Sequence, residues 1–210
     1  MNKLSFNLKA FIKESVDVLL NPKSYFSKMK TTGGVAEPLT KALIYGALAG
    51  IIGFLWYKAD LGSTILLGKA HGFMTIIWFM VIAIVVLFVG GLLLMFISAL
   101  CKGSNDYEAN VRVTAAVMVL MPFSVLLGFV GDLNVIAGVI VSLAINIFSL
   151  YIIYFGLTET LKANPTTAKI VIIVLILLTA LLMIIGIGTK KSVNNLNKNF
   201  KEIIENVKKD

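Results

Sequence analysis

Apolar residues dominate five long segments of the chain, and polar residues gather in the shorter stretches between them. The five segments cover residues 39–57, 73–100, 111–130, 135–157 and 170–188. A helix needs roughly 20 apolar residues to cross the ~30 Å hydrocarbon core of a bilayer. The pattern therefore predicts an all-α integral membrane protein, a polytopic bundle of five transmembrane helices.

Two further segments, one near each end of the chain, alternate apolar and charged residues with helical periodicity. In the first, Leu8, Phe11 and Ile12 share a face, and charged residues lie mostly opposite. In the second, Phe200 and Ile204 belong to an apolar stripe among many lysines. Such helices can lie in the headgroup layer with the apolar face toward the acyl chains. For the first helix, packing against the protein's own spans is an equally good interpretation.

The apolar pattern divides the chain into three parts. Residues 1–37 form amino-terminal amphipathic helices and a linker, residues 38–189 the five-span domain, and residues 190–210 a basic amphipathic tail. Asn21-Pro22 and Asn164-Pro165 each place a residue suited to the N-cap before a proline suited to the first helical position. We therefore expect a new helix to start at both sites.

Other short motifs predict details of the second and third spans. Asn105 and Glu108 have the spacing of a capping box, and Glu108 and Arg112 form a favourable pair four residues apart. Pro122 removes one backbone donor inside the third span and predicts a kink there. The second span is longer than the bilayer core and should tilt, with Gly90-Gly91 as the place for a bend.

Small and polar residues inside the spans are candidates for helix packing. Gly46 and Gly50 have the spacing that lets two helix backbones approach closely, and we expect the neighbour to be internal rather than a second copy. Ser142, Asn146 and Ser149 share a face of the fourth span, where they can hydrogen-bond across helices. The alternative for these three residues is a lining of a solute path.

Composition agrees with a membrane protein and limits the other classes. The 210 residues are 58% hydrophobic and 14% charged, with a mean hydropathy of +0.92, whereas a typical soluble domain is roughly 25% charged. Beside five spans, this length leaves no room for a separate soluble enzyme. The net charge of +8 comes from lysines that flank the spans. Anionic headgroups are therefore the expected partner, and nucleic acid is not.

The distribution of lysine and arginine predicts the orientation. With a cytoplasmic amino terminus, most of these residues ahead of position 170 fall on the cytoplasmic side, and only Lys58 and Lys69 fall outside. This bias is typical of cytoplasmic loops. The tail disagrees, because five spans place its six lysines outside. We keep five spans and a cytoplasmic amino terminus as the prediction.

Catalytic, metal and cofactor sites are not indicated. Cys101 is the only cysteine, which excludes an intrachain disulfide and a cysteine-based metal cluster. His71 is the only histidine, and with Asp60 it offers two candidate ligands where zinc needs three or four. Because the predicted membrane interior has no titratable side chain, we predict a non-enzymatic protein without a cofactor.

Several short motifs follow one another in a recognisable order. They are Leu20-Asn21-Pro22, Tyr25-Phe26, Pro38-Leu39, Gly103-Ser104 with Tyr107, Arg112 and Ala115-Ala116, then Pro122, Gly156-Leu157 and Lys169. Over residues 19–188 this order resembles the Yip1-domain family of small polytopic membrane proteins. The resemblance implies five spans with a cytoplasmic amino terminus and, in eukaryotic members, vesicle trafficking through Rab-type GTPases and partner membrane proteins. The compact form resembles bacterial or archaeal members.

We therefore predict a membrane protein that organises the bilayer or its partners, as a trafficking-like scaffold or adaptor. It would contact the interface through Leu8, Phe11, Ile12, Phe200 and Ile204. The expected partners are a bilayer with anionic headgroups, other membrane proteins or a second copy of the chain. The alternative is a small permease or channel subunit for a neutral or hydrophobic solute, lined by the polar face of the fourth span.

Overall fold

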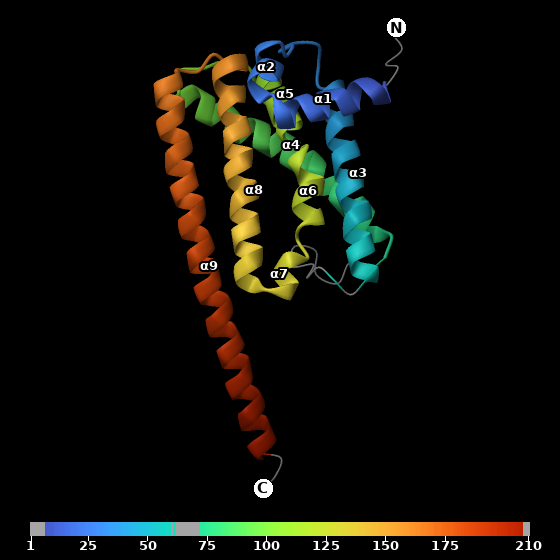
Figure 1. Cartoon of the computed structure of the whole chain (residues 1–210), viewed down its shortest axis with the longest axis vertical. Coiled ribbons are helices and arrows are strands. Elements are labelled where there is room, and N and C mark those ends of the chain that lie inside the picture. The colour runs from blue at the N-terminus through green and yellow to red at the C-terminus, as the bar shows by residue number, and fades with distance from the viewer. Residues whose placement is uncertain (1–6, 60, 62–71, 208–210) are drawn as a thin grey trace.

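The chain folds into a bundle of helices with one end covered by its amino-terminal segment. The computed structural model describes residues 7–59, 61 and 72–207, with side chains as far as Gly186. Its elements are α1 (Leu8–Leu20), α2 (Pro22–Ser27), α3 (Ala36–Lys58), α4 (Met74–Leu100), α5 (Tyr107–Val117), α6 (Leu120–Leu126), α7 (Val130–Leu133), α8 (Val135–Phe155), η1 (Gly156–Thr160) and α9 (Pro165–Val207). Figure 1 shows α1 and α2 lying across one end of the bundle, which we call the α1 end.

Five helical segments of the described chain are long and apolar enough to cross a membrane. They are Ala36–Lys58, Met74–Leu100, Tyr107–Leu133, Val135–Thr160 and Pro165–Gly186. The third is built from α5, α6 and α7, and the fourth from α8 and the π-helix η1. The predicted all-α membrane bundle is therefore confirmed. The long second span, α4, runs obliquely across the bundle (Figure 1).

The third span is interrupted four residues before its proline. In an unbroken helix the carbonyl of Met118 would accept a hydrogen bond from residue 122, and Pro122 has no N–H to donate. The Met118 carbonyl instead accepts from the Met121 N–H at 2.9 Å, and residues 118–119 separate α5 from α6. The distortion caused by Pro122 thus falls one turn ahead of the proline itself.

Glycines bring α3 and α4 into close contact. A Cβ at Gly46 would lie 2.7 Å from the Cβ of Ala83, and a Cβ at Gly50 would lie 2.7 Å from the Cα of Ile76. Real Cβ atoms essentially never approach so closely. The two glycines therefore face α4 of the same chain, and only a residue without a side chain allows this separation.

α4 continues as a helix through Gly90-Gly91, where the sequence predicts a bend. A Cβ at Gly91 would lie 2.6 Å from the Cγ2 of Val111, and one at Gly90 would lie 3.0 Å from the Cγ2 of Thr114. The glycine pair thus makes room for α5 against α4.

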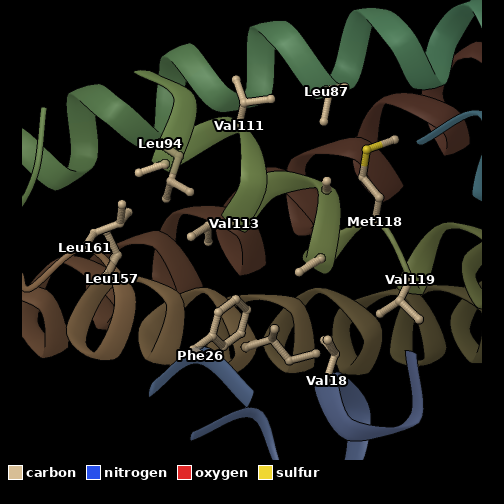
Figure 2. Close-up of a cluster of buried hydrophobic side chains, with 14 of the residues drawn as sticks. Val18, Phe26, Leu87, Leu94, Val111, Val113, Met118, Val119, Leu157 and Leu161 are labelled. Atoms are coloured by element: carbon tan, nitrogen blue, oxygen red, sulfur yellow. The ribbon is translucent and has the colours of Figure 1, made fainter. Parts of the chain in front are cut away.

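The buried core includes side chains from the amino-terminal helices. Figure 2 shows Val18 of α1 and Phe26 of α2 pointing toward the cluster that contains Val113 and Leu157. Phe26 is 1% exposed, and Val113 and Leu157 are fully buried. In α8, Ile152 is the one buried residue, and it lies near the end of the helix that leads into η1. Part of the buried core therefore lies at the α1 end, and much of the remaining apolar surface faces outward, as expected for spans in lipid.

The predicted helix starts are partly as expected. Asn164 caps α9, because its Oδ1 accepts from the N–H groups of Thr166 and Thr167, so that prediction is confirmed. Asn21 precedes Pro22 at the start of α2 but makes no side-chain capping bond. The predicted capping box at Asn105 was wrong by one residue. Asp106 is the N-cap of α5, where its Oδ1 accepts from the Glu108 N–H at 3.2 Å.

The last span and the predicted tail helix form one continuous helix. α9 has 43 residues, which at 1.5 Å per residue is a length of about 65 Å, roughly twice a bilayer core. Figure 1 shows α9 extending well past the other helices at the end away from α1. The side chains of Phe200 and Ile204 lie outside the described residues, and so do Asp60 and His71.

Candidate functional site

The α1 end gathers segments that are far apart in the sequence. The N–H of Ser104 donates to the carbonyl of Leu161 at 2.7 Å, and the N–H of Asn164 donates to that of Cys101 at 2.8 Å. The connections that follow α4 and α8 are therefore joined to each other. The hydroxyl of Thr160 donates to the Phe26 carbonyl at 2.8 Å, which ties α2 to the same place.

α1 presents two different apolar faces. Phe11 is 7% exposed, and its ring lies 5.1 Å from the ring of Tyr45 on α3. By contrast, Leu8 is 60% exposed and Ile12 is 53% exposed. The sequence predicts that three residues of α1 contact the membrane interface. Of these, Phe11 packs on the protein, and Leu8 and Ile12 are exposed. The Phe11 face thus packs on the protein's own spans, and contact of the exposed face with the membrane interface stays a prediction.

The exposed apolar face of α1 runs the whole length of the helix. Leu8, Ile12, Val16 and Leu20 follow at intervals of four residues, and all four are exposed apolar side chains. We call them the α1 stripe. On a helix this spacing places successive side chains on one slowly turning face. The charged Lys9 and Lys13 flank the stripe and are also exposed.

Arg112 is the centre of a buried ion-pair network. It is only 7% exposed, and its Nε lies 3.2 Å from Oε1 of Glu108, which confirms the predicted pair. Its other nitrogens donate to Oε2 of Glu37 at 3.0 Å and to the carbonyl of Gly34 at 2.8 Å. Glu108 also accepts from the N–H of Gly34 at 2.6 Å. A single side chain of α5 thereby holds the linker and the start of α3.

Lys41 extends this network to α1. Its Nζ lies 2.6 Å from Oε2 of Glu14 and 2.7 Å from Oε1 of Glu37. We refer to Glu14, Glu37, Lys41, Glu108 and Arg112 as the charge network. The pair between Glu37 and Lys41 has helical spacing that sequence reasoning could have found. The contacts to Glu14 and between Arg112 and Glu37 join distant segments and leave no local signal.

A pocket of about 740 Å³ opens beside the charge network. It is lined by α1, α2, the linker that follows α2, and parts of α3 and α5. Tyr25 of α2 is one of its walls, and burial raises the pKa of this phenol to about 12. Tyr25 is therefore a neutral hydroxyl at physiological pH, able to donate a hydrogen bond.

The polar face predicted for the fourth span has a different role in the structure. Asn146 is exposed on α8, and its Nδ2 donates to the carbonyl of Ser142 on the same helix at 2.8 Å. Ser142 is also exposed, and Ser149 is half-buried. The predicted bond across helices is thus replaced at Asn146 by one within α8, because no neighbouring helix covers this face in the described chain.

Metal-binding chemistry has no structural counterpart in the part of the chain described here. No group of three or more His, Cys, Asp or Glu side chains in that part is arranged to hold a metal ion. At the α1 end, Glu14, Glu37 and Glu108 instead pair with the lysine and arginine of the charge network.

A comparison with protein families settles what kind of domain this is. The family model for the Yip1 domain matches residues 16–187. The chain belongs to the Yip1-domain family. No curated protein matches the chain, and no solved structure matches it. The matched region begins inside α1, so α2, most of the charge network and all five spans belong to the Yip1 domain.

The bond between Thr160 and Phe26 gives a first testable prediction for this Yip1 domain. Thr160 is 7% exposed and Phe26 is 1% exposed, so water would not replace the hydroxyl, and the Phe26 carbonyl would be left with the longer bond from the Met29 N–H at 3.4 Å. Thr160→Val keeps the side-chain shape and removes the hydroxyl. We expect a loss of about 1 kcal/mol in the free energy of unfolding and faster proteolysis between α2 and α3. Thr166→Val, at an exposed position on α9, is the control and should change neither.

Proposed function

We propose that this Yip1-domain protein is a non-enzymatic organiser of the membrane or an adaptor for partner membrane proteins, acting through its α1 end. The α1 stripe carries the proposal. Four large apolar side chains on one helix are exposed, although the same helix is firmly anchored through Phe11, Val18 and Glu14. A fixed apolar surface at the end of a transmembrane bundle is suited to contact lipid or another membrane protein.

The charges around the stripe support a place in the headgroup layer. α1 lies where the spans α3, α5 and α9 begin and where α4 and α8 lead into their connections. Lys9 and Lys13 are exposed beside the stripe, and each lysine near an anionic membrane surface contributes about 1 kcal/mol of attraction. An interfacial helix combines these two features, an apolar face and flanking cations.

We further propose that the α1 end lies in the cytoplasm. Besides the lysines of α1 and α2, the same end carries Lys102 and Lys162 in the connections that follow α4 and α8. An excess of lysine and arginine is typical of cytoplasmic segments near spans.

A non-enzymatic role is supported by the way the titratable groups are used. Lys41 and Arg112 are each held by two carboxylates, at distances from 2.6 to 3.2 Å. Groups engaged in this way stabilise the docking of α1 and the linker, whereas an acid–base catalyst must be able to exchange its proton with a substrate. The Yip1 family is not known for enzymatic activity.

Spin labels on α1 test whether the stripe enters the bilayer. The buried Cys101 is first replaced by alanine, and single cysteines are then placed at Ile12 and Lys13 of the full-length protein in nanodiscs. We expect the label at position 12 to collide more often with oxygen, which dissolves in lipid, than with a water-soluble nickel complex. The label at position 13 should show the reverse order. Equal accessibility at the two positions would contradict insertion of the stripe.

A photo-crosslinker at position 12 tests the adaptor role in native membranes. We expect adducts with lipid or with a defined membrane protein, and their loss when Leu8 is also changed to aspartate. A crosslinker at the exposed Ile140 on α8 serves as the control for general contact with the membrane. If positions 12 and 140 give the same adducts, the α1 end has no special role.

A further inference from the structure

We propose that the pocket beside the charge network binds a phosphate-bearing anionic headgroup of a membrane lipid. Its volume of about 740 Å³ is within the ~300–1,000 Å³ range of small-molecule sites. It lies between α1, α2 and the ends of the spans α3 and α5, a level at which lipid headgroups meet a transmembrane bundle. This proposal does not depend on insertion of the α1 stripe.

The lining of the pocket has an excess of positive charge. Five of its side chains are cationic and three are carboxylates. Lys41 and Arg112 are matched by Glu14 and Glu37 inside the charge network. The other three cations are Lys13, Lys28 and Lys30, and Asp17 is the remaining carboxylate.

The three outer lysines are available to a ligand. Lys13, Lys28 and Lys30 come from α1 and from the chain that follows α2, and they form no ion pair with another described residue. Lys13, Lys28 and Lys30 are all exposed. Ammonium groups approaching one pocket from two segments favour an anion with several oxygen acceptors, and phosphate is such a group.

The inner wall supplies donors that are already held in place. Lys41 directs its ammonium group at two carboxylates and retains a third N–H for another acceptor. Tyr25 is kept as a neutral phenol, so it adds a donor without adding negative charge. Apolar atoms of Met29, Pro38 and Ala115 complete the lining and suit the glycerol backbone next to a phosphate.

The test is lipid binding by the full-length protein in detergent, measured by native mass spectrometry. The probes are phosphatidylglycerol, phosphatidylcholine and, as a soluble phosphate without acyl chains, glycerol 3-phosphate. The variant K28Q/K30Q removes two outer lysines that do not belong to the charge network. The control K9Q/K23Q removes the same charge from exposed lysines of α1 and α2 that do not line the pocket.

We expect K28Q/K30Q to weaken phosphatidylglycerol binding about tenfold and K9Q/K23Q to weaken it less than twofold. Tyr25→Phe should give a smaller loss, because it removes one donor and no charge. Competition by glycerol 3-phosphate would show that the phosphate itself is recognised, and its failure would assign recognition to the whole lipid. Equal losses in the two double variants, or no loss in either, would overturn the proposal. The spin-label result at position 12 is independent of these outcomes.

Discussion

Replacement of Arg112 by methionine should lower the free energy of unfolding by about 3 kcal/mol. The substitution retains much of the apolar length of the side chain and removes the charge that faces Glu37 and Glu108. Loss of one partner of a buried ion pair costs about 3–5 kcal/mol, because the remaining charge loses its compensation. We expect the lower end of this range, since Glu37 is 48% exposed and part of its charge stays hydrated.

Two variants separate the charge of Arg112 from its geometry. Arg112→Lys keeps the charge but cannot contact Glu37, Glu108 and the Gly34 carbonyl at once, so an intermediate loss is expected. Arg112→Met combined with Glu108→Gln should recover part of the loss, because Arg112 is the one described residue that forms an ion pair with Glu108, whereas Glu37 keeps its pair with Lys41. Unfolding in mixed detergent–SDS micelles gives the required free energies.

The matched control for Arg112 is Lys23→Met, at an exposed position of α2. It removes one positive charge from the same end of the bundle and should change stability by less than about 0.5 kcal/mol. If Arg112→Met is no more harmful than this control, the charge network does not hold the linker and α3 in place.

The number and type of the spans could be predicted because a bilayer imposes a simple length and polarity requirement on each helix. The same reasoning does not show whether an apolar helix face packs against the protein or is exposed on the outside of the bundle. Phe11 and Ile12 are adjacent and both apolar, yet one packs against Tyr45 and the other is exposed. Periodicity detects both faces of α1, and only the tertiary structure separates protein contact from the exposed surface.

The charge network could be predicted only where it is local. The pair of Glu108 with Arg112 follows from helical spacing, whereas Glu37 lies 75 residues from Arg112 in the chain. A similar limit applies to Asn146. An amide in an apolar helix can bond a neighbouring helix or its own backbone four residues earlier, and the sequence is compatible with both.

The second large effect is expected at Gly50, where the backbones of α3 and α4 are in close contact. The Cβ of a new side chain would lie 2.7 Å from the Cα of Ile76 and 3.2 Å from its carbonyl oxygen. Both of these atoms belong to the backbone, so a change of rotamer cannot relieve the contact. Gly50→Leu must therefore move α4 away from α3, and overpacking of this kind costs about 1–3 kcal/mol.

We expect Gly50→Leu to lose about 3 kcal/mol in the same SDS unfolding measurement and Gly50→Ala about 1 kcal/mol. Gly46→Leu should behave like Gly50→Leu, because its Cβ would meet Ala83 and the Phe79 carbonyl oxygen at 2.7 and 2.9 Å.

Gly186→Leu is the matched control, since it lies in the last span and no other helix of the described chain comes within 4 Å of its Cβ position. It adds the same side chain to another transmembrane helix and should leave the unfolding free energy within about 0.5 kcal/mol of the original. The two classes of glycine differ only in what surrounds them. A loss at Gly186 as large as that at Gly50 would mean that the cost comes from replacing glycine in a helix, and contact between α3 and α4 would then not explain it.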